Sequence, residues 1–116
     1  MKTVEKPWGK EVWFAQTDKY VGKLLYLLPG KRLSLQLHRV KDETLCLLEG
    51  DCVIQCGDLE HRLTQSREEA VRIQPETIHR ISTEHGAVLV EVSTPEVEDV
   101  VRLEDDYGRI PGKPGH

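Results

Sequence analysis

An antiparallel all-β domain is the fold class that the sequence predicts, on three observations. About nine short apolar or alternating runs follow one another, most of them separated by Gly, Pro, Asp or pairs of charged residues. No stretch carries a convincing helical stripe of apolar side chains. The length of 116 residues suits one domain with one core. Together these features favour a sandwich or barrel of antiparallel strands.

The expected strands are short and closely spaced. They lie at 12–15, 22–28, 32–38, 43–49, 51–56, 59–64, 70–74, 77–83 and 86–93. Residues 96–106 suit either a short helix or a closing strand. The domain is expected to span 1–110 and to be followed by a flexible tail at 111–116, whose His116 has no predicted ligand role.

Polar and apolar side chains alternate along 31–38. In a strand, four polar side chains would share one face and three leucines the opposite face. The polar residues are Arg32, Ser34, Gln36 and His38. If both faces are enclosed, the polar row lines a pocket.

A metal site is predicted from this row and two later residues. Glu43 opens the next expected strand, and pairing of that strand with 32–38 would bring its carboxylate close to His38. His79, in P-E-T-I-H-R, adds a second imidazole. With the amide of Gln36, this set suits a first-row divalent metal and leaves room for water or substrate. We expect one divalent cation, with Zn as the first candidate and Mn, Fe, Co or Ni as the others.

These motifs resemble a known superfamily. Residues 30–50 are similar to the cupin pattern G-x5-H-x-H-x4-E-x6-G with Gln36 in place of the first His, and P-E-T-I-H resembles the core of the second cupin motif. The Gln variant resembles the cupin domain of type II mannose-6-phosphate isomerases. So do P-W-G at 7–9 and E-D-D-Y-G-R at 104–109. The resemblance covers most of the chain and implies a cupin double-stranded β-helix, which is a jelly-roll barrel.

The resemblance also implies a function. We expect aldose–ketose isomerisation of a sugar phosphate through a metal-stabilised cis-enediolate, with Gln36, His38, Glu43 and His79 as metal ligands. One alternative is a non-catalytic, metal-containing cupin that binds a sugar or sugar phosphate. Another is an Fe(II) cupin dioxygenase, because two His and one Glu also resemble the facial triad of those enzymes.

Five residues are candidates for substrate contacts: Arg32, Ser34, Lys41, Arg80 and Arg109. Arg32, Lys41 and Arg80 would hold phosphate. For Arg32, pairing with a carboxylate near the barrel mouth is an equal alternative. Lys41 stands where the type II isomerases carry an Arg, and its ammonium cannot reproduce the bidentate contact of a guanidinium.

Glu91 is the candidate catalytic base, with Lys41 as the second catalytic candidate. Glu91 lies in A-V-L-V-E-V-S, where it shares one face with Ala87, Leu89 and Ser93. It would either pair with Arg80 or Arg32 or face the cavity, where burial would raise its pKa. Tyr107 and Arg109 would either close the pocket mouth or anchor the tail.

The remaining features limit the partners. A formal charge of −4 gives no reason to expect nucleic acid or an anionic membrane. No apolar run is long enough for a transmembrane span, and the N-terminus lacks a secretory signal, so we expect a cytoplasmic protein.

The chain has no G-x-G motif and is not expected to make nucleotide sugars alone. Cys46, Cys52 and Cys56 are expected to be reduced, buried thiols. By analogy of fold, we expect a homodimer that pairs through edge strands.

Overall fold

The computed structural model describes residues 1–66 and 68–110, so the expected tail at 111–116 lies outside the described residues. Ten strands and no helix are found in this part of the chain. The strands are β1 (Lys2–Lys6), β2 (Gly9–Gln16), β3 (Val21–Leu27), β4 (Leu35–Leu37), β5 (Glu43–Cys56), β6 (Leu59–Thr64), β7 (Ala70–Ile73), β8 (His79–Ser82), β9 (Ala87–Ser93) and β10 (Val101–Glu104).

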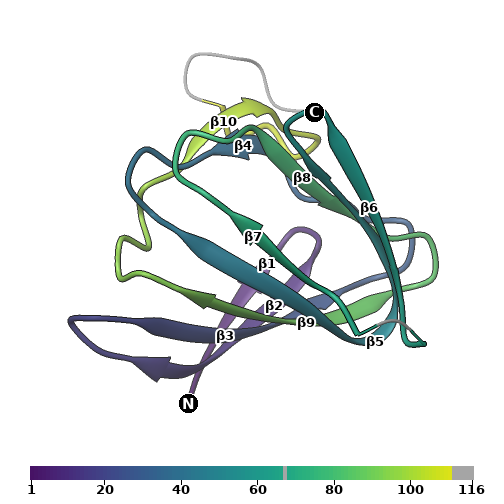
Figure 1. The fold of residues 1–116 in the computed structure, drawn as a ribbon, viewed down its shortest axis with the longest axis horizontal. Coiled ribbons are helices and arrows are strands. Elements are labelled where there is room, and N and C mark those ends of the chain that lie inside the picture. The colour runs from purple at the N-terminus through teal and green to yellow at the C-terminus, as the bar shows by residue number, and fades with distance from the viewer. Residues whose placement is uncertain (67, 111–116) are drawn as a thin grey trace.

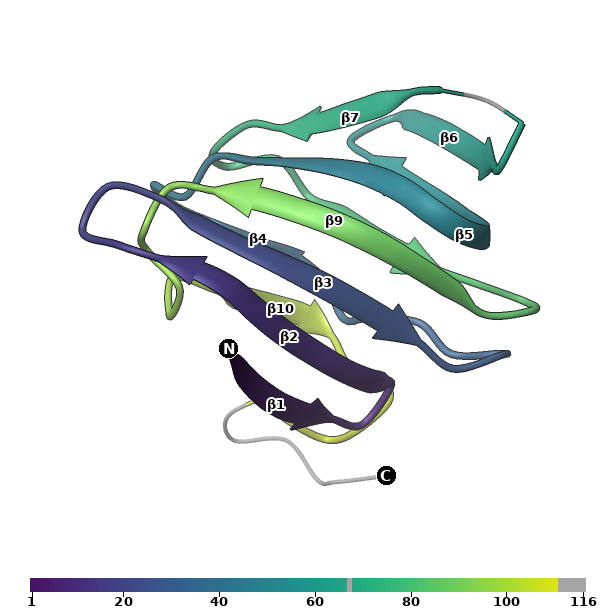
Figure 2. The same ribbon diagram turned by 90° about the horizontal axis from the view of Figure 1, so that it is seen from below.

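The strands form two antiparallel layers that share β5. One layer has the order β1-β2-β3-β9-β5-β7, and these strands lie side by side in Figure 2. The other has the order β10-β4-β8-β5-β6. Figure 1 shows β4, β8 and β10 on one side of the molecule and β2, β3 and β9 on the other. The expectation of an all-β jelly-roll barrel is confirmed.

A single long strand, β5, connects the two layers where two strands were predicted. Its first half pairs with β9, Asp51–Cys56 pairs with β6, and Val53–Cys56 also pairs with β8. Gly50 marks the change, with φ of 81°. A Cβ at this position would collide with the carbonyl oxygen of Gly86, so only glycine lets the two backbones approach this closely.

The core lies between the layers and is made by alternate residues of their strands. On β9, Ala87 and Leu89 are buried, and Glu91 follows them on the same inward face. The P-W-G motif has a structural role, since Trp8 is 2% exposed and packs in the core. A Cβ on Gly9 would overlap the carbonyl oxygen of Tyr26, which explains the glycine beside that tryptophan.

Three local predictions were wrong or incomplete. Strand β1 was not predicted, because its alternation of mostly exposed side chains leaves no apolar row to detect. The expected strand at 32–38 has only three residues in regular pairing, and β4 pairs with β8 and β10 instead of β5. For 96–106, the structure decides between helix and strand, since β10 closes the second layer beside β4.

Candidate metal centre

Three of the four predicted metal ligands converge in the cavity between the layers. Nε2 of His38 lies 3.1 Å from Oε1 of Glu43, and Nε2 of His79 lies 3.2 Å from the same oxygen. One ligand atom from each residue falls within 4.8 Å of the others, and all three residues are buried. His38 and Glu43 meet across the 39–42 turn, although their strands do not pair as expected.

The hydrogen bonds of the two imidazoles fix which ring nitrogen carries the proton and which one presents a lone pair to Glu43. Nδ1 of His38 lies 2.6 Å from the carbonyl oxygen of Asp99, and Nδ1 of His79 lies 2.8 Å from that of Thr77. A carbonyl only accepts, so each Nδ1 carries the proton and donates it. In the neutral rings, both Nε2 lone pairs therefore point towards the Glu43 carboxylate.

Two lone pairs and a carboxylate at this separation repel one another, and a proton or a metal ion between them relieves the repulsion. Nε2 of His79 is buried and lacks hydrogen-bond geometry with any described residue, despite its 3.2 Å distance from Glu43. Burial disfavours the charged form of Glu43, whereas the Lys41 ammonium, 3.6 Å away, favours it. Histidines that bind a metal typically donate the other ring N–H to a backbone carbonyl, as these two imidazoles do. The residues present therefore fit a divalent cation.

Gln36 lies beside this cluster. Its Cα is the register partner of His79 across β4 and β8, so the two side chains leave the sheet on the same face. Its Oε1 accepts a hydrogen bond of 3.0 Å from the hydroxyl of Ser34. Ser34 is 1% exposed, and this contact gives it a role in orienting the amide.

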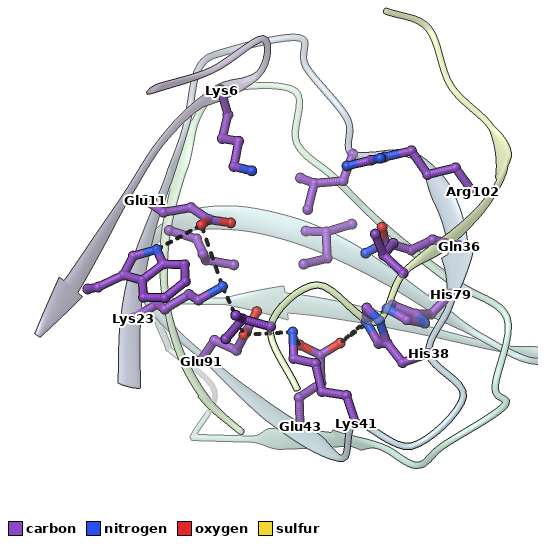
Figure 3. Close-up of a pocket in the computed structure, with 16 residues that line it drawn as sticks. Lys6, Glu11, Lys23, Gln36, His38, Lys41, Glu43, His79, Glu91 and Arg102 are labelled. Carbon is purple, nitrogen blue, oxygen red and sulfur yellow. Dashed lines mark hydrogen bonds and ion pairs between the residues drawn. The ribbon is translucent and has the colours of Figure 1, made fainter. Parts of the chain in front are cut away.

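A chain of buried charges continues from the metal ligands along the cavity wall (Figure 3). Nζ of Lys41 lies 3.6 Å from Glu43 and 3.2 Å from Glu91. Nζ of Lys23 then lies 4.0 Å from Glu91 and 3.5 Å from Glu11. The carboxylate of Glu91 thus lies in the same cavity as the imidazoles, held between two lysines.

The environment of Glu91 favours a group that can exchange a proton near neutral pH. Burial and then the negative charge of Glu43 raise the pKa of Glu91 to about 7, although Lys41 and Lys23 act in the opposite direction. The prediction that burial raises this pKa is confirmed. The alternative partners Arg80 and Arg32 were wrong, because the cations beside Glu91 are lysines.

Two of the predicted arginines hold the fold together outside this cavity. Arg32 is exposed and makes a bidentate pair with Asp106, at 2.6 and 2.8 Å. Arg80 donates to the carbonyl oxygens of Leu33 and Glu104. Neither side chain is among those that line the metal-site cavity.

The E-D-D-Y-G-R motif also forms contacts that fasten the end of the described chain. Arg109 makes a bidentate pair with Asp105, at 2.9 Å for both contacts. The hydroxyl of Tyr107 donates to the carbonyl oxygen of Arg32 at 2.9 Å. These contacts correspond to the anchoring alternative. Arg109 nevertheless lines a smaller hollow of about 60 Å³ that adjoins the metal-site cavity.

Sequence reasoning missed four charged residues of the cavity wall: Lys6, Glu11, Lys23 and Arg102. A signal existed for Lys23, which alternates with Val21, Leu25 and Leu27 on the buried face of β3. A lysine in such a row needs a buried counter-charge, and that requirement marks an enclosed polar site.

The thiols differ in part from the expectation. All three cysteines are free, as predicted, but only Cys52 is fully buried. Burial raises the pKa of the Cys52 thiol to about 11. Cys46 is exposed, because it points to the outer face of β5.

The family of this chain is shown by a match over most of its length. A profile described as "Mannose-6-phosphate isomerase C-terminal" matches residues 1–110. The chain belongs to this family. The glutamine variant of the cupin motif thus identified the family correctly from the sequence.

Curated relatives of the family are longer than this chain. Alginate biosynthesis protein AlgA of Pseudomonas aeruginosa is 30% identical over 111 residues, which cover 91% of this chain and 23% of the relative. Mannose-1-phosphate guanylyltransferase of Escherichia coli K12 is 30% identical over 116 residues, covering 94% and 23%. The chain therefore spans less than a quarter of the length of these relatives.

Solved structures show the same fold at low identity. The capsular polysaccharide assembling protein CapF of Staphylococcus aureus superposes with a TM-score of 0.74 at 20% identity, over 89% of this chain and 34% of that chain. KdgF of Halomonas sp. gives 0.74 at 15% identity, over 85% and 92%. An RmlC-like cupin of Shewanella frigidimarina also gives 0.74, at 14% identity, over 84% and 86%. The fold is that of a cupin.

Within residues 1–66 and 68–110, the structure contains no helix that could span a membrane.

Proposed function

We propose that this mannose-6-phosphate isomerase-type cupin interconverts an aldose phosphate and its ketose phosphate with the help of one divalent metal ion. The observation that supports the proposal best is the buried arrangement of His38, Glu43 and His79 beside Glu91 in one cavity. The cavity volume is about 110 Å³, which exceeds the space needed for a single water and leaves room for reacting groups beside a cation.

The metal would be held by the two Nε2 atoms and a Glu43 oxygen, with the Gln36 amide as the fourth ligand. When bound, the cation would act as a Lewis acid towards two neighbouring substrate oxygens. We propose zinc, because two imidazoles, a carboxylate and an amide oxygen suit tetrahedral or slightly expanded coordination.

Glu91 would be the base that moves a proton between the two carbons of the reaction. Its carboxylate is buried in the cavity and not committed to a structural arginine. Isomerisation removes a proton from C2 of the aldose and returns one to C1, so a single carboxylate that accepts and then donates can carry the carbon-bound proton, while the proton of the O2 hydroxyl passes to O1. Lys41, 3.2 Å away, would keep the carboxylate oriented and hold its charge after the proton leaves.

The reaction is tested with the metal-loaded full chain and mannose 6-phosphate, with fructose 6-phosphate measured by a coupled enzyme assay. We expect turnover that depends on zinc, manganese, cobalt or iron. Absence of turnover with each of these metals contradicts the isomerase proposal.

A binding protein without catalysis is the second candidate, favoured by one feature. Lys41 stands at the position of the family arginine, and both of its contacts are to carboxylates of the site itself. Saturable binding of mannose 6-phosphate without product in the same experiment selects this candidate. Uptake of oxygen by an iron-loaded sample would instead indicate dioxygenase chemistry.

We also propose a homodimer in the cytoplasm. The first layer has a free edge at β1 that could pair with a second copy. Its outer face also carries an apolar row, in which Val92 is 51% exposed and Phe14 is 46% exposed. Free thiols suit a reducing compartment. Light scattering should give twice the chain mass, and a monomer at micromolar concentration contradicts the dimer.

A further inference from the structure

Two cations of the metal-site cavity have no ion-pair partner among the described residues. Lys6, at the end of β1, and Arg102, on β10, both line this cavity and the smaller hollow beside it. Within 1–66 and 68–110, neither forms an ion pair with a carboxylate. Nε of Arg102 is in addition buried without a hydrogen-bond acceptor. Figure 3 shows the ends of both side chains in the same part of the cavity, on the side away from Glu43 and Lys41.

The carboxylates of the cavity are already engaged elsewhere. Glu43 and Glu91 contact Lys41. Glu11 accepts a hydrogen bond of 2.9 Å from the indole of Trp13 and lies 3.5 Å from Lys23. The end of the cavity at Lys6 and Arg102 therefore carries positive charge that no direct ion pair neutralises among the described residues.

The surroundings of both cations disfavour their charged forms. Burial lowers the pKa of Lys6, and the charges of Lys23, Arg109 and Arg102 lower it further, against an opposing effect of Glu11. Burial and the charge of Arg109 likewise lower the pKa of Arg102, against an opposing effect of Asp105. Holding such cations together without a partner costs stability, so the arrangement is expected where a ligand supplies the missing negative charge.

The strand register places this end of the cavity in line with the metal ligands. Arg102 pairs with Gln36 across β10 and β4, and Gln36 pairs with His79 across β4 and β8. Register partners project from the same face of a sheet. Two strand spacings separate Arg102 from His79, which corresponds to about 10 Å between backbones. A small elongated ligand can thus contact both.

We propose that Lys6 and Arg102 form an anion subsite that binds the phosphate group of a small phosphorylated ligand. A guanidinium offers two parallel donors to phosphate oxygens, and the ammonium supplies a second charge, so that a dianion neutralises both. The inference rests on the proposed function, in that the sugar phosphate held at the metal end would carry this phosphate. In this proposal Lys6 and Arg102 bind the phosphate instead of Arg32 and Arg80, which make structural contacts outside the cavity.

The subsite is tested by calorimetric titration of the zinc-loaded full chain with inorganic phosphate at low ionic strength. Lys6→Met and Arg102→Gln are each expected to weaken binding by about 10-fold or more, because each removes a charge-assisted hydrogen bond. Each variant should also melt at the same temperature as the parent chain or higher, since a half-buried charge without an ion-pair partner is removed. Lys10→Met and Arg62→Gln, which change exposed side chains, should stay within about twofold of the parent.

Three outcomes overturn the subsite. They are no phosphate binding by the parent chain, binding by Lys6→Met and Arg102→Gln within twofold of the parent, and loss of binding in the metal-ligand variant His79→Asn while Lys6→Met binds normally. The last result would place phosphate on the metal. Turnover is a separate measurement, so phosphate binding that depends on Lys6 and Arg102 in an inactive protein supports the subsite and contradicts only the isomerase function.

Discussion

Glu91→Gln is expected to lower kcat for mannose 6-phosphate by about 10²- to 10⁴-fold, the range typical for loss of a positioned general base. The amide keeps the size of the side chain but cannot accept the proton. Metal content should be unchanged, because Glu91 is not one of the three converging ligands. Kinetics and elemental analysis on the same preparation measure both quantities.

The controls separate a catalytic role from a structural one. Glu91→Gln leaves Lys41 and Lys23 less compensated, so circular dichroism and thermal melting must show a folded protein. Glu91→Asp retains the charge but withdraws the carboxylate by one methylene, and should show an intermediate loss of kcat. Glu84→Gln, at an exposed site, should match the parent. A Glu91→Gln protein that is folded and retains kcat within fivefold contradicts the assignment of the base.

Loss of the metal is the second large effect that we expect. His79→Ala should lower zinc affinity by at least about 10²-fold, a lower bound suggested by the 10- to 100-fold effects of changing residues that merely support a ligand. Treatment of the parent chain with a chelator should abolish turnover, and added zinc should restore it. Metal analysis after dialysis and activity recovery measure these effects.

The same metal should stabilise the fold. A ligand present at 100 times its Kd stabilises the native state by about 2.7 kcal/mol. For a domain of this size, that corresponds to a rise in Tm on the order of 10 °C. His85→Ala is the matched control, because His85 is an exposed histidine paired with Asp51. Equal melting temperatures of the parent with zinc and with chelator contradict a structural contribution of the metal.

The sequence predicted the fold class and the closeness of His38, Glu43 and His79. Alternation along 32–38 and the turn at 39–42 were enough to place His38 near Glu43. The resemblance of P-E-T-I-H to the second cupin motif linked them to His79, which is far away in the chain. The predicted pairing of 32–38 with 43–49 was incorrect. The closeness of His38 and Glu43 was still predicted correctly, because the turn between them brings them together whichever strands pair.

The charged wall of the cavity could not be predicted in the same way. Its ion pairs join strands that are neighbours only in the folded sheet, as Lys23 and Glu91 are across β3 and β9. Arg32 was placed on the correct polar row, but its partner Asp106 lies 74 residues later, and the pairing turns the guanidinium to the surface. Such long-range pairs depend on topology, which periodicity alone does not specify.

The account depends most on a cation bound between His38, Glu43 and His79. Crystals of the zinc-loaded protein, measured above and below the zinc absorption edge, test this directly. We expect an anomalous peak about 2.0–2.2 Å from both Nε2 atoms and a Glu43 oxygen. A structure with full zinc content that shows no peak there, or shows the peak at another site, contradicts the account.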